Sequence, residues 1–225
     1  MLTVSCVFVR GPYPYTPEYV VRLEAMCRRW IDRPFEFVVF TDQPERFPGF
    51  TRKQIEVGPH PADGYWGKVQ VFDPRWKLTG RCLYLDLDSL IVAPLDPIID
   101  APAQFALTED ALVQERQHLD RDRYGRQLVR RFNSSVMVWD GGTQDHLARN
   151  WSPAVAERLS TDQDWIGEQC PEAMALPLAW FPRISQVRPP WPDEAKVVLV
   201  KKPKNHEAVK RWPELAAWWG GEVAA

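Results

Sequence analysis

A strand, a helix and a second strand follow one another within residues 1–41, and this order constrains the fold more than any other feature. Residues 2–9 form an apolar run rich in β-branched side chains, which is typical of a buried strand. Thr16 and Pro17 supply an N-cap and a first helical proline, and apolar residues then recur at helical spacing as far as Trp30. Residues 35–41 form the second strand. Because such a unit folds with a right-handed, parallel connection, we predict an α/β domain.

The rest of the chain continues the alternation of strands and helices. Apolar runs predict further strands at residues 81–85, 104–108, 134–139 and 195–200. Helical spacing predicts a helix over 65–78 that is interrupted at Pro74, a helical stretch through Leu147, Trp151 and Val155, and a helix that begins at Asp162. The sequence shows no repeat, no low-complexity segment and no linker. We therefore predict a single domain over residues 1–225.

The composition is that of an ordinary globular protein and excludes several classes. Hydrophobic residues make up 45% of the chain and charged residues 26%, which excludes disordered, collagen-like and coiled-coil proteins. The 28 basic and 30 acidic residues nearly cancel, so the net charge is only −2. Such a chain has no overall field that would attract a polyanion. We therefore expect no nucleic-acid partner.

Two features of the sequence predict a cytoplasmic protein. The N-terminus lacks a basic region and reaches Arg10 too soon for a signal peptide, and no apolar run approaches the ~18 residues of a membrane span. Four widely scattered cysteines form no C-x-x-C pair, so reduced thiols are expected. They are Cys6, Cys27, Cys82 and Cys170.

Asp86 and Asp88 form the most informative local pattern. They follow the apolar strand at residues 81–85, and residues two apart in extended backbone point to the same side. Two carboxylates would thus project together from a strand end, which is where α/β sheets place their ligands. A hard divalent cation with oxygen ligands would relieve their repulsion. The alternative is an exposed loop with two solvated acids, which the apolar continuation at residues 90–92 disfavours.

The chain resembles the GT-A glycosyltransferases, specifically the family 8 group of glycogenin and bacterial lipopolysaccharide galactosyltransferases. The matching pieces follow one another in family order over nearly the whole chain. They are residues 19–30 with 37–42, then 65–68, 84–88, 132–139 and 162–165. The resemblance implies a mixed, mostly parallel sheet flanked by helices. It also implies a metal-dependent, retaining transfer of a sugar from a nucleotide diphosphate donor, most often UDP-linked, to a cell-surface saccharide or lipid-linked glycan acceptor.

The resemblance also assigns roles to individual residues. Asp86 and Asp88 match the family's Asp-x-Asp pair, which binds Mn²⁺ or Mg²⁺, and the first of them also reaches the ribose. Lys68, Asn133 and Ser134 match positions of the family that bind the donor. Asp162 and Gln163 match the pair that holds the sugar hydroxyls at the reaction centre. Arg10 and Tyr13 are assigned to the nucleotide by their location after the first strand. The alternatives are a solvated helix lysine for Lys68, a turn-forming residue for Asn133 and a helix N-cap for Asp162 and Gln163.

Lys201 departs from the family pattern. It stands where the family has a histidine that ligates the metal, and a protonated lysine cannot ligate a cation. His206 lies five residues further on and is the nearest other candidate. We expect the Lys201 ammonium to neutralise the donor diphosphate directly, with a weaker dependence on Mn²⁺ than is usual for the family.

Two further hypotheses remain open from the sequence. The first is a catalytically inactive nucleotide- or glycan-binding protein of the same fold. The second is a peripheral contact with the inner face of the membrane through the short amphipathic segment 213–220, where Leu215, Trp218 and Trp219 share a helical face near Trp212. The alternative is that this face packs on the protein's own core. No Walker, dinucleotide-binding, Gly-x-Ser-x-Gly or His-Glu-x-x-His motif points to another enzyme class.

Overall fold

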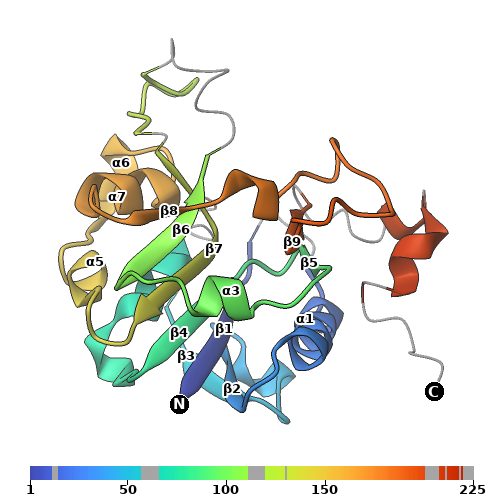
Figure 1. Ribbon diagram of the computed structural model, residues 1–225. Helices are drawn as coiled ribbons and strands as arrows, with labels where there is room; N and C mark the ends of the chain where they lie inside the picture. The colour runs from blue at the N-terminus through green and yellow to red at the C-terminus, as the bar shows by residue number, and fades with distance from the viewer. Residues whose placement is uncertain are drawn as a thin grey trace.

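The computed structural model of the protein describes residues 1–11, 15–56, 66–110, 120–129, 131–200, 208–210, 212–217 and 219. In this described part, seven strands form one sheet in the order β3-β2-β1-β4-β7-β6-β8, with helices on both sides of it (Figure 1). The strands are β1 (Leu2–Phe8), β2 (Phe35–Thr41), β3 (Thr51–Gln54), β4 (Arg81–Leu85), β6 (Phe105–Glu109), β7 (Phe132–Asp140) and β8 (Met174–Leu176). The predicted α/β class is confirmed.

The sheet is mixed and mostly parallel. Parallel pairing joins β1 to β2 and to β4, and β2 to β3, so the strand–helix–strand opening is parallel as predicted. β7 runs antiparallel between β4 and β6, while β8 is parallel to β6. Two short strands, β5 (Ser89–Ile91) and β9 (Val197–Leu199), form a separate antiparallel ladder. The predicted strand at 195–200 is therefore present, but it pairs outside the main sheet.

The predicted helix starts at Pro17 and Asp162 are confirmed. The helices between residues 145 and 158 are shorter than expected. The α-helices are α1 (Pro17–Trp30), α3 (Asp96–Ile99), α5 (Asp145–Arg149), α6 (Pro153–Arg158) and α7 (Asp162–Gln169). The 3₁₀ helices are η1 (Pro44–Arg46), η2 (Gly67–Phe72), η3 (Pro74–Trp76), η4 (Leu178–Trp180) and η5 (Pro213–Ala217). The helical stretch predicted through Leu147 and Val155 divides in two, because Pro153 begins a new helix.

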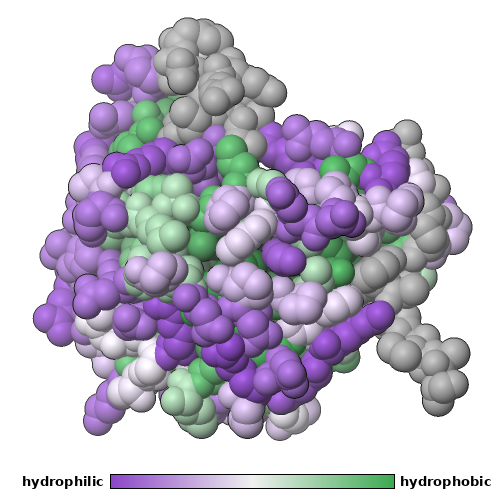
Figure 2. Space-filling view, in the orientation of Figure 1, coloured by the Kyte–Doolittle hydropathy of each residue, from purple (hydrophilic) through white to green (hydrophobic). Residues whose placement is uncertain are grey.

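Alternation along the central strands divides the core between the two faces of the sheet. Val4 of β1 and Leu83 of β4 are buried on the face that α1 covers. Val7 and Cys82, from the same strands, are buried on the face that η2 and α7 cover. Because both faces are covered, these strands read as nearly continuous apolar runs in the sequence. On the face shown in Figure 2, hydrophilic side chains predominate among the coloured residues, with hydrophobic ones in patches between them.

The helix predicted over residues 65–78 is wrong in its type. Trp66 is α-helical, and from Gly67 onward two 3₁₀ helices, η2 and η3, follow. Asp73 separates them in extended backbone, with ψ at 124°, because the following Pro74 disfavours the helical conformation at the preceding residue. Lys77 then ends η3 with a positive φ of 51°. The predicted interruption at Pro74 is confirmed, while the helical segment before it is 3₁₀ rather than α.

The C-terminal segment packs on the protein itself wherever it is described. Leu215 and Trp219 are buried in the main core. The Trp219 ring meets Tyr19 of α1 edge to face with centroids 5.1 Å apart, and the Arg22 guanidinium lies 4.5 Å from the centroid of Trp219. The alternative of packing on the core is therefore confirmed for these two residues, while Trp218 lies outside the described residues. Within the described ranges, the helices are too short or too polar to cross a membrane.

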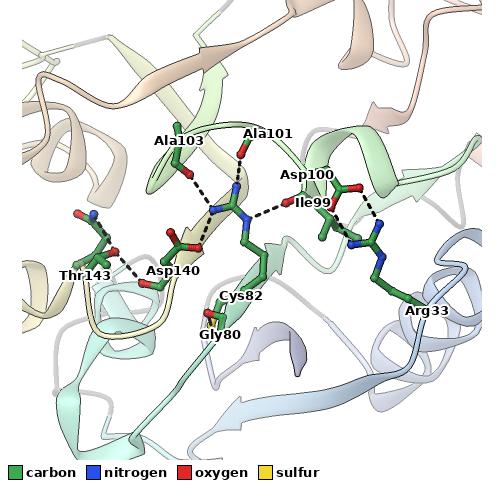
Figure 3. A network of polar contacts seen from close by, with 11 residues as sticks. Arg33, Gly80, Cys82, Ile99, Asp100, Ala101, Ala103, Asp140 and Thr143 are labelled. Carbon is green, nitrogen blue, oxygen red and sulfur yellow. Dashed lines mark hydrogen bonds and ion pairs between the residues drawn. The ribbon is translucent and has the colours of Figure 1, made fainter.

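Arg81, at the start of β4, connects the sheet to the loop after α3 (Figure 3). Its guanidinium donates hydrogen bonds to the carbonyl oxygens of Ile99, Ala101 and Ala103, each over 2.7 Å, and to Asp140 Oδ1 over 3.0 Å. The side chain is 18% exposed. Arginine suits this position because its five donors have a fixed planar geometry.

Replacing Arg81 with methionine should lower the free energy of unfolding by about 3 kcal/mol, because three carbonyl oxygens lose a charged donor while the buried stem is kept. Urea unfolding measures the loss. Arg28→Met is the matched control, since the exposed Arg28 makes only surface contacts, an ion pair with Glu24 one helical turn away and a cation–π contact with Phe35, which together contribute about 1 kcal/mol. Equal losses in the two variants would contradict a structural role for Arg81.

Asp122 organises the turn at residues 120–127. Its carboxylate accepts hydrogen bonds from the backbone N–H groups of Tyr124 and Arg126, from Arg126 Nε and from the Ser160 hydroxyl, over 2.8–2.9 Å. Burial raises the pKa of Asp122, but the hydrogen bonds outweigh it and lower the pKa to about 2. The turn is thereby tied to the residue that precedes Thr161 and α7.

The contribution of Asp122 to stability should disappear in acid. Its pKa is lower in the folded chain than in the unfolded chain, so its stabilisation is complete above the unfolded value and is lost as the pH falls toward about 2. We expect the gap in unfolding free energy between the wild type and Asp122→Asn to stay constant from about pH 7 to 5 and to shrink by about pH 3. Urea titrations measure it, with the exposed Asp193→Asn as control. A gap of unchanged size at the lower pH would rule the explanation out.

Candidate active site at the carboxyl ends of the central strands

The candidate site lies where the order of the strands changes direction. The connection from β1 leads to β2 on one side, and the connection from β3 returns to β4 on the other side of β1, so the order of the strands reverses at β1. Ligands bind at such switch points in α/β sheets. Asp86 follows β4 at this edge, and its backbone N–H donates to the carbonyl oxygen of Ser135 in β7 over 2.8 Å. The sheet therefore brings the Asp86 and Asp88 segment to the edge that the sequence predicted.

Lys68 of η2 lies at the centre of a polar cluster formed with Asp86, Ser134 and Asp162. Its Nζ is 2.9 Å from Asp86 Oδ1 and 3.4 Å from Asp162 Oδ2. It also donates to the hydroxyl oxygen of Ser134 over 3.0 Å and to the Ser134 carbonyl oxygen over 3.3 Å. Lys68 is buried, so the alternative of a solvated helix lysine is wrong. A buried ammonium requires such carboxylate partners, since desolvation without them is costly.

An irregularity in the sheet places Ser134 in this cluster. The register of β6 and β7 shifts between Leu107 and Thr108, so residues 134–136 lie outside the β6 ladder. Bulges of this kind redirect side chains and are frequent beside active sites. The Ser134 hydroxyl donates to Asp162 Oδ2 over 2.6 Å. Ser134 is therefore buried between two other candidate residues.

Asp162 occupies a rigid position at the first turn of α7. Thr161 is the N-cap of the helix, and its backbone N–H donates to Asp164 Oδ2 over 3.1 Å in a capping box. Asp164 Oδ1 also accepts from the backbone N–H of Val129 over 2.8 Å. The proposed N-cap alternative for Asp162 is therefore wrong, because Thr161 fills that position. The Asp162 side chain is only 5% exposed and is directed to Lys68.

Burial and charge act against each other throughout the cluster. Burial lowers the pKa of Lys68, but the Asp162 and Asp86 carboxylates outweigh it and raise that pKa to about 12. Burial raises the pKa of Asp162 above its ordinary value, although Lys68 and the Ser134 hydrogen bond oppose the rise. The cluster is therefore a buried ammonium with carboxylates on two sides, an arrangement suited to exchanging partners with an anionic ligand.

Asp88 lies next to this cluster and is held by Tyr15. The phenol of Tyr15 hydrogen-bonds to the Asp88 carboxylate. Burial and the neighbouring charge of Asp86 raise the pKa of Asp88 well above its ordinary value. The two carboxylates therefore act on each other, but the extended backbone predicted for residues 86–88 is wrong, because they form a turn in which Ser89 N–H donates to the Asp86 carbonyl oxygen over 3.1 Å. Within the described ranges, no three of the His, Cys, Asp and Glu side chains lie close enough to form a complete metal-binding group.

The other candidate residues lie around the cluster or outside the described part. Arg10 follows β1, is 76% exposed and pairs with Asp42 Oδ2 over 2.8 Å. Asn133 Oδ1 accepts from the backbone N–H of Ser135 over 2.9 Å, and Gln163 is partly buried beside Asp162. Tyr13, Lys201 and His206 lie outside the described residues. The chain leaves the β9 segment at Val200, one residue before Lys201.

Two tyrosines of the site were missed from the sequence. The Tyr84 hydroxyl donates to Asp86 Oδ1 over 2.8 Å, and the Lys68 Nζ lies 5.1 Å from the centroid of the Tyr84 ring. The signal for Tyr84 was available, because it precedes Asp86 by two residues on the same strand and therefore shares its face. Tyr15 precedes a helix in a loop, and no periodicity could have directed it to Asp88.

Comparisons of sequence alone give no relative, since no protein-family model matches the chain and no curated protein matches it. Comparisons of structure do. The galactosyltransferase LgtC, in a complex with donor and acceptor sugar analogues, aligns with 99% of this chain and 97% of its own at 14% identity, with a TM-score of 0.63. An active-site mutant of LgtC aligns with 96% of this chain and 95% of its own at 15% identity and a TM-score of 0.58.

The similarity extends to a second glycosyltransferase. The apo form of GlyE from Streptococcus pneumoniae covers 80% of this chain at 12% identity and a TM-score of 0.51, and the match spans 46% of the GlyE chain. Identities this low establish the fold alone. The fold that the sequence predicted is nevertheless confirmed over nearly the whole chain: it is the GT-A fold of the glycosyltransferases.

Proposed function

We propose that this chain is a glycosyltransferase that moves a sugar from a UDP-linked donor to a glycan or lipid-linked acceptor with retention of configuration. The observation that carries the proposal is the cluster of Lys68, Asp86, Ser134 and Asp162 at the switch point of a GT-A fold. The sugar analogues bound by LgtC support a donor and an acceptor of the same chemical class.

We assign the leaving diphosphate to the space beside the Lys68 ammonium, because the diphosphate is negatively charged. Departure of a nucleoside diphosphate develops negative charge on its oxygens, which a preorganised cation stabilises. Lys68 can turn one N–H from the Ser134 carbonyl oxygen, which lies 3.3 Å away, toward those oxygens while it keeps Asp86 and Asp162 as partners. We also assign the diphosphate to Lys201 and the nucleotide to Arg10 and Tyr13, following the sequence prediction.

Carboxylate and amide groups are assigned to the sugar side. The anomeric carbon becomes oxocarbenium-like in the transition state, and polar groups hold the sugar hydroxyls as it forms. Asp162 and Gln163, at the start of α7, are assigned to these hydroxyls, and Asn133 to the space beside the donor sugar. Because Asp162 accepts from both Lys68 and Ser134, its carboxylate is positioned before the donor arrives.

A divalent cation fits this site as a partner of the donor. Asp86 and Asp88 supply two hard carboxylate groups, and Mg²⁺ is commonly bound by one or two carboxylates together with substrate phosphates. These two residues would hold Mn²⁺ or Mg²⁺, which supplies charge stabilisation to the leaving diphosphate. The Lys68 ammonium, 2.9 Å from Asp86, contributes positive charge of its own at the same place.

Hydrolysis of the donor tests the proposal without a known acceptor. The purified protein is incubated with a panel of UDP-sugars, with Mn²⁺ or with EDTA, and the release of free sugar and UDP is measured by chromatography. The expected result is slow release from one donor, with UDP raising the melting temperature in the same buffer. A melting shift without release would favour the inactive binding protein. Neither release nor a shift would contradict both the UDP-dependent transferase and an inactive protein that binds UDP.

A further inference from the structure

Tyr84 has a place in the sheet that leaves it little freedom. It lies in β4, opposite Ser5 of β1 and Met137 of β7, so it is paired on both sides. Its side chain is buried, with 2% exposed. Asp86 follows two residues later on the same face of the strand. The Tyr84 side chain therefore has a fixed position next to the carboxylate of Asp86.

The contacts of Asp86 are confined to one of its two oxygens. Oδ1 accepts from the Tyr84 hydroxyl over 2.8 Å and lies 2.9 Å from Lys68 Nζ. A carboxylate oxygen offers two lone-pair positions, so these two donors fill it. Among the described residues no hydrogen bond reaches Oδ2, and the side chain is 25% exposed. One oxygen is thus committed to the protein, while the other is left for a ligand.

We propose that Tyr84 is a positioning residue that holds Oδ1 of Asp86 to the protein, so that Asp86 meets the donor through Oδ2 alone. The inference rests on the proposed function. A single acceptor oxygen matches one ribose hydroxyl, or one coordination position of a cation, and excludes two-point chelation by Asp86. The Tyr84 ring also faces the Lys68 ammonium, with 5.1 Å between Nζ and the ring centroid. This cation–π contact favours a position of the ammonium from which it can reach both Asp86 and the diphosphate.

Tyr84→Phe tests this role, because it removes the hydroxyl and keeps the ring. Calorimetric titration of UDP is carried out with Mn²⁺ and with EDTA. The variant should bind UDP about tenfold more weakly than the wild type, which is the effect of one charge-assisted hydrogen bond. Tyr124→Phe is the matched control, since Tyr124 is 67% exposed and lies outside the cluster; it should bind UDP as the wild type does.

A double-mutant cycle separates positioning from general damage to the core. If Tyr84 acts through Asp86, Tyr84→Phe should change UDP affinity less than about twofold in an Asp86→Asn background, because the effects of coupled residues are not additive. A tenfold loss that persists in that background would overturn the inference, as would wild-type affinity in Tyr84→Phe alone. A wild-type protein that binds no UDP would instead contradict the proposed function, so the two failures are distinguishable.

Discussion

Asp88→Asn should abolish release of sugar from the donor, with a loss of at least about 10²–10³-fold, while the protein stays folded. The loss follows because one of the two carboxylates beside the diphosphate site becomes neutral, and removal of a single transition-state contact commonly costs this much. The free energy of unfolding should be unchanged or higher. The substitution removes the like-charge repulsion between Asp86 and Asp88, which is one cause of the raised pKa of Asp88. Tyr15 can still donate to the amide oxygen of the asparagine.

Donor hydrolysis and thermal melting of the same preparation measure the two effects. Asp193→Asn is the matched control, because it removes one exposed carboxylate away from the cluster. An Asp88→Asn protein that hydrolyses the donor at the wild-type rate would remove Asp88 from the reaction. A large fall in melting temperature would show that the carboxylate is structural.

Lys68→Met should destabilise the protein by about 3–5 kcal/mol and remove UDP binding. The substitution leaves the buried Asp162 facing Asp86 without the ammonium that lies between them, and breaking a buried ion pair from one side has this cost. Urea unfolding measures the free energy of unfolding, and calorimetry measures UDP affinity. Both quantities should change together, because the same ammonium serves the fold and the ligand.

A second substitution in the same chain tests the cause. Asp162→Asn removes the uncompensated charge but keeps an oxygen that can accept from Ser134, so Lys68→Met with Asp162→Asn should regain about 2 kcal/mol over Lys68→Met alone. UDP binding should stay lost in the double variant. If the two substitutions instead add their destabilising effects, the charges of Lys68 and Asp162 are not coupled as the structure indicates.

The sequence predicted the five inner strands of the main sheet closely, β2, β1, β4, β7 and β6, and missed its two edge strands, β3 and β8. The apolar runs of β1, β2 and β4 are buried on both faces, so their patterns are continuous and their limits are clear. β3 and β8 were missed because they are short and mostly exposed. The segment at η2 has helical spacing in its apolar residues, and Pro74 accounts for the break after it, but spacing alone does not distinguish a 3₁₀ from an α-helix.

The candidate site shows the same division. Asp86, Asp88 and Lys68 were found because a strand end and a family pattern point to them. The mutual contacts of Lys68, Ser134 and Asp162 join elements far apart in the chain, and no local pattern contains such distances. The Tyr15 contact with Asp88 depends on a loop conformation, which the side-chain types near residue 15 do not determine.

The packing of the C-terminal segment has a consequence for the order in which the protein is made. Tyr15, which bonds to Asp88, meets Tyr19 edge to face at 5.2 Å, and Tyr19 meets Trp219 at 5.1 Å. Arg22 of the same helix also donates to the Trp219 carbonyl oxygen over 2.6 Å. During translation, Tyr15 and Tyr19 are therefore synthesised early, whereas Trp219, which packs against Tyr19, is added about 200 residues later. A nascent chain that ends before Trp219 cannot form these contacts behind Tyr15, so the packing behind the candidate site is completed only late in translation.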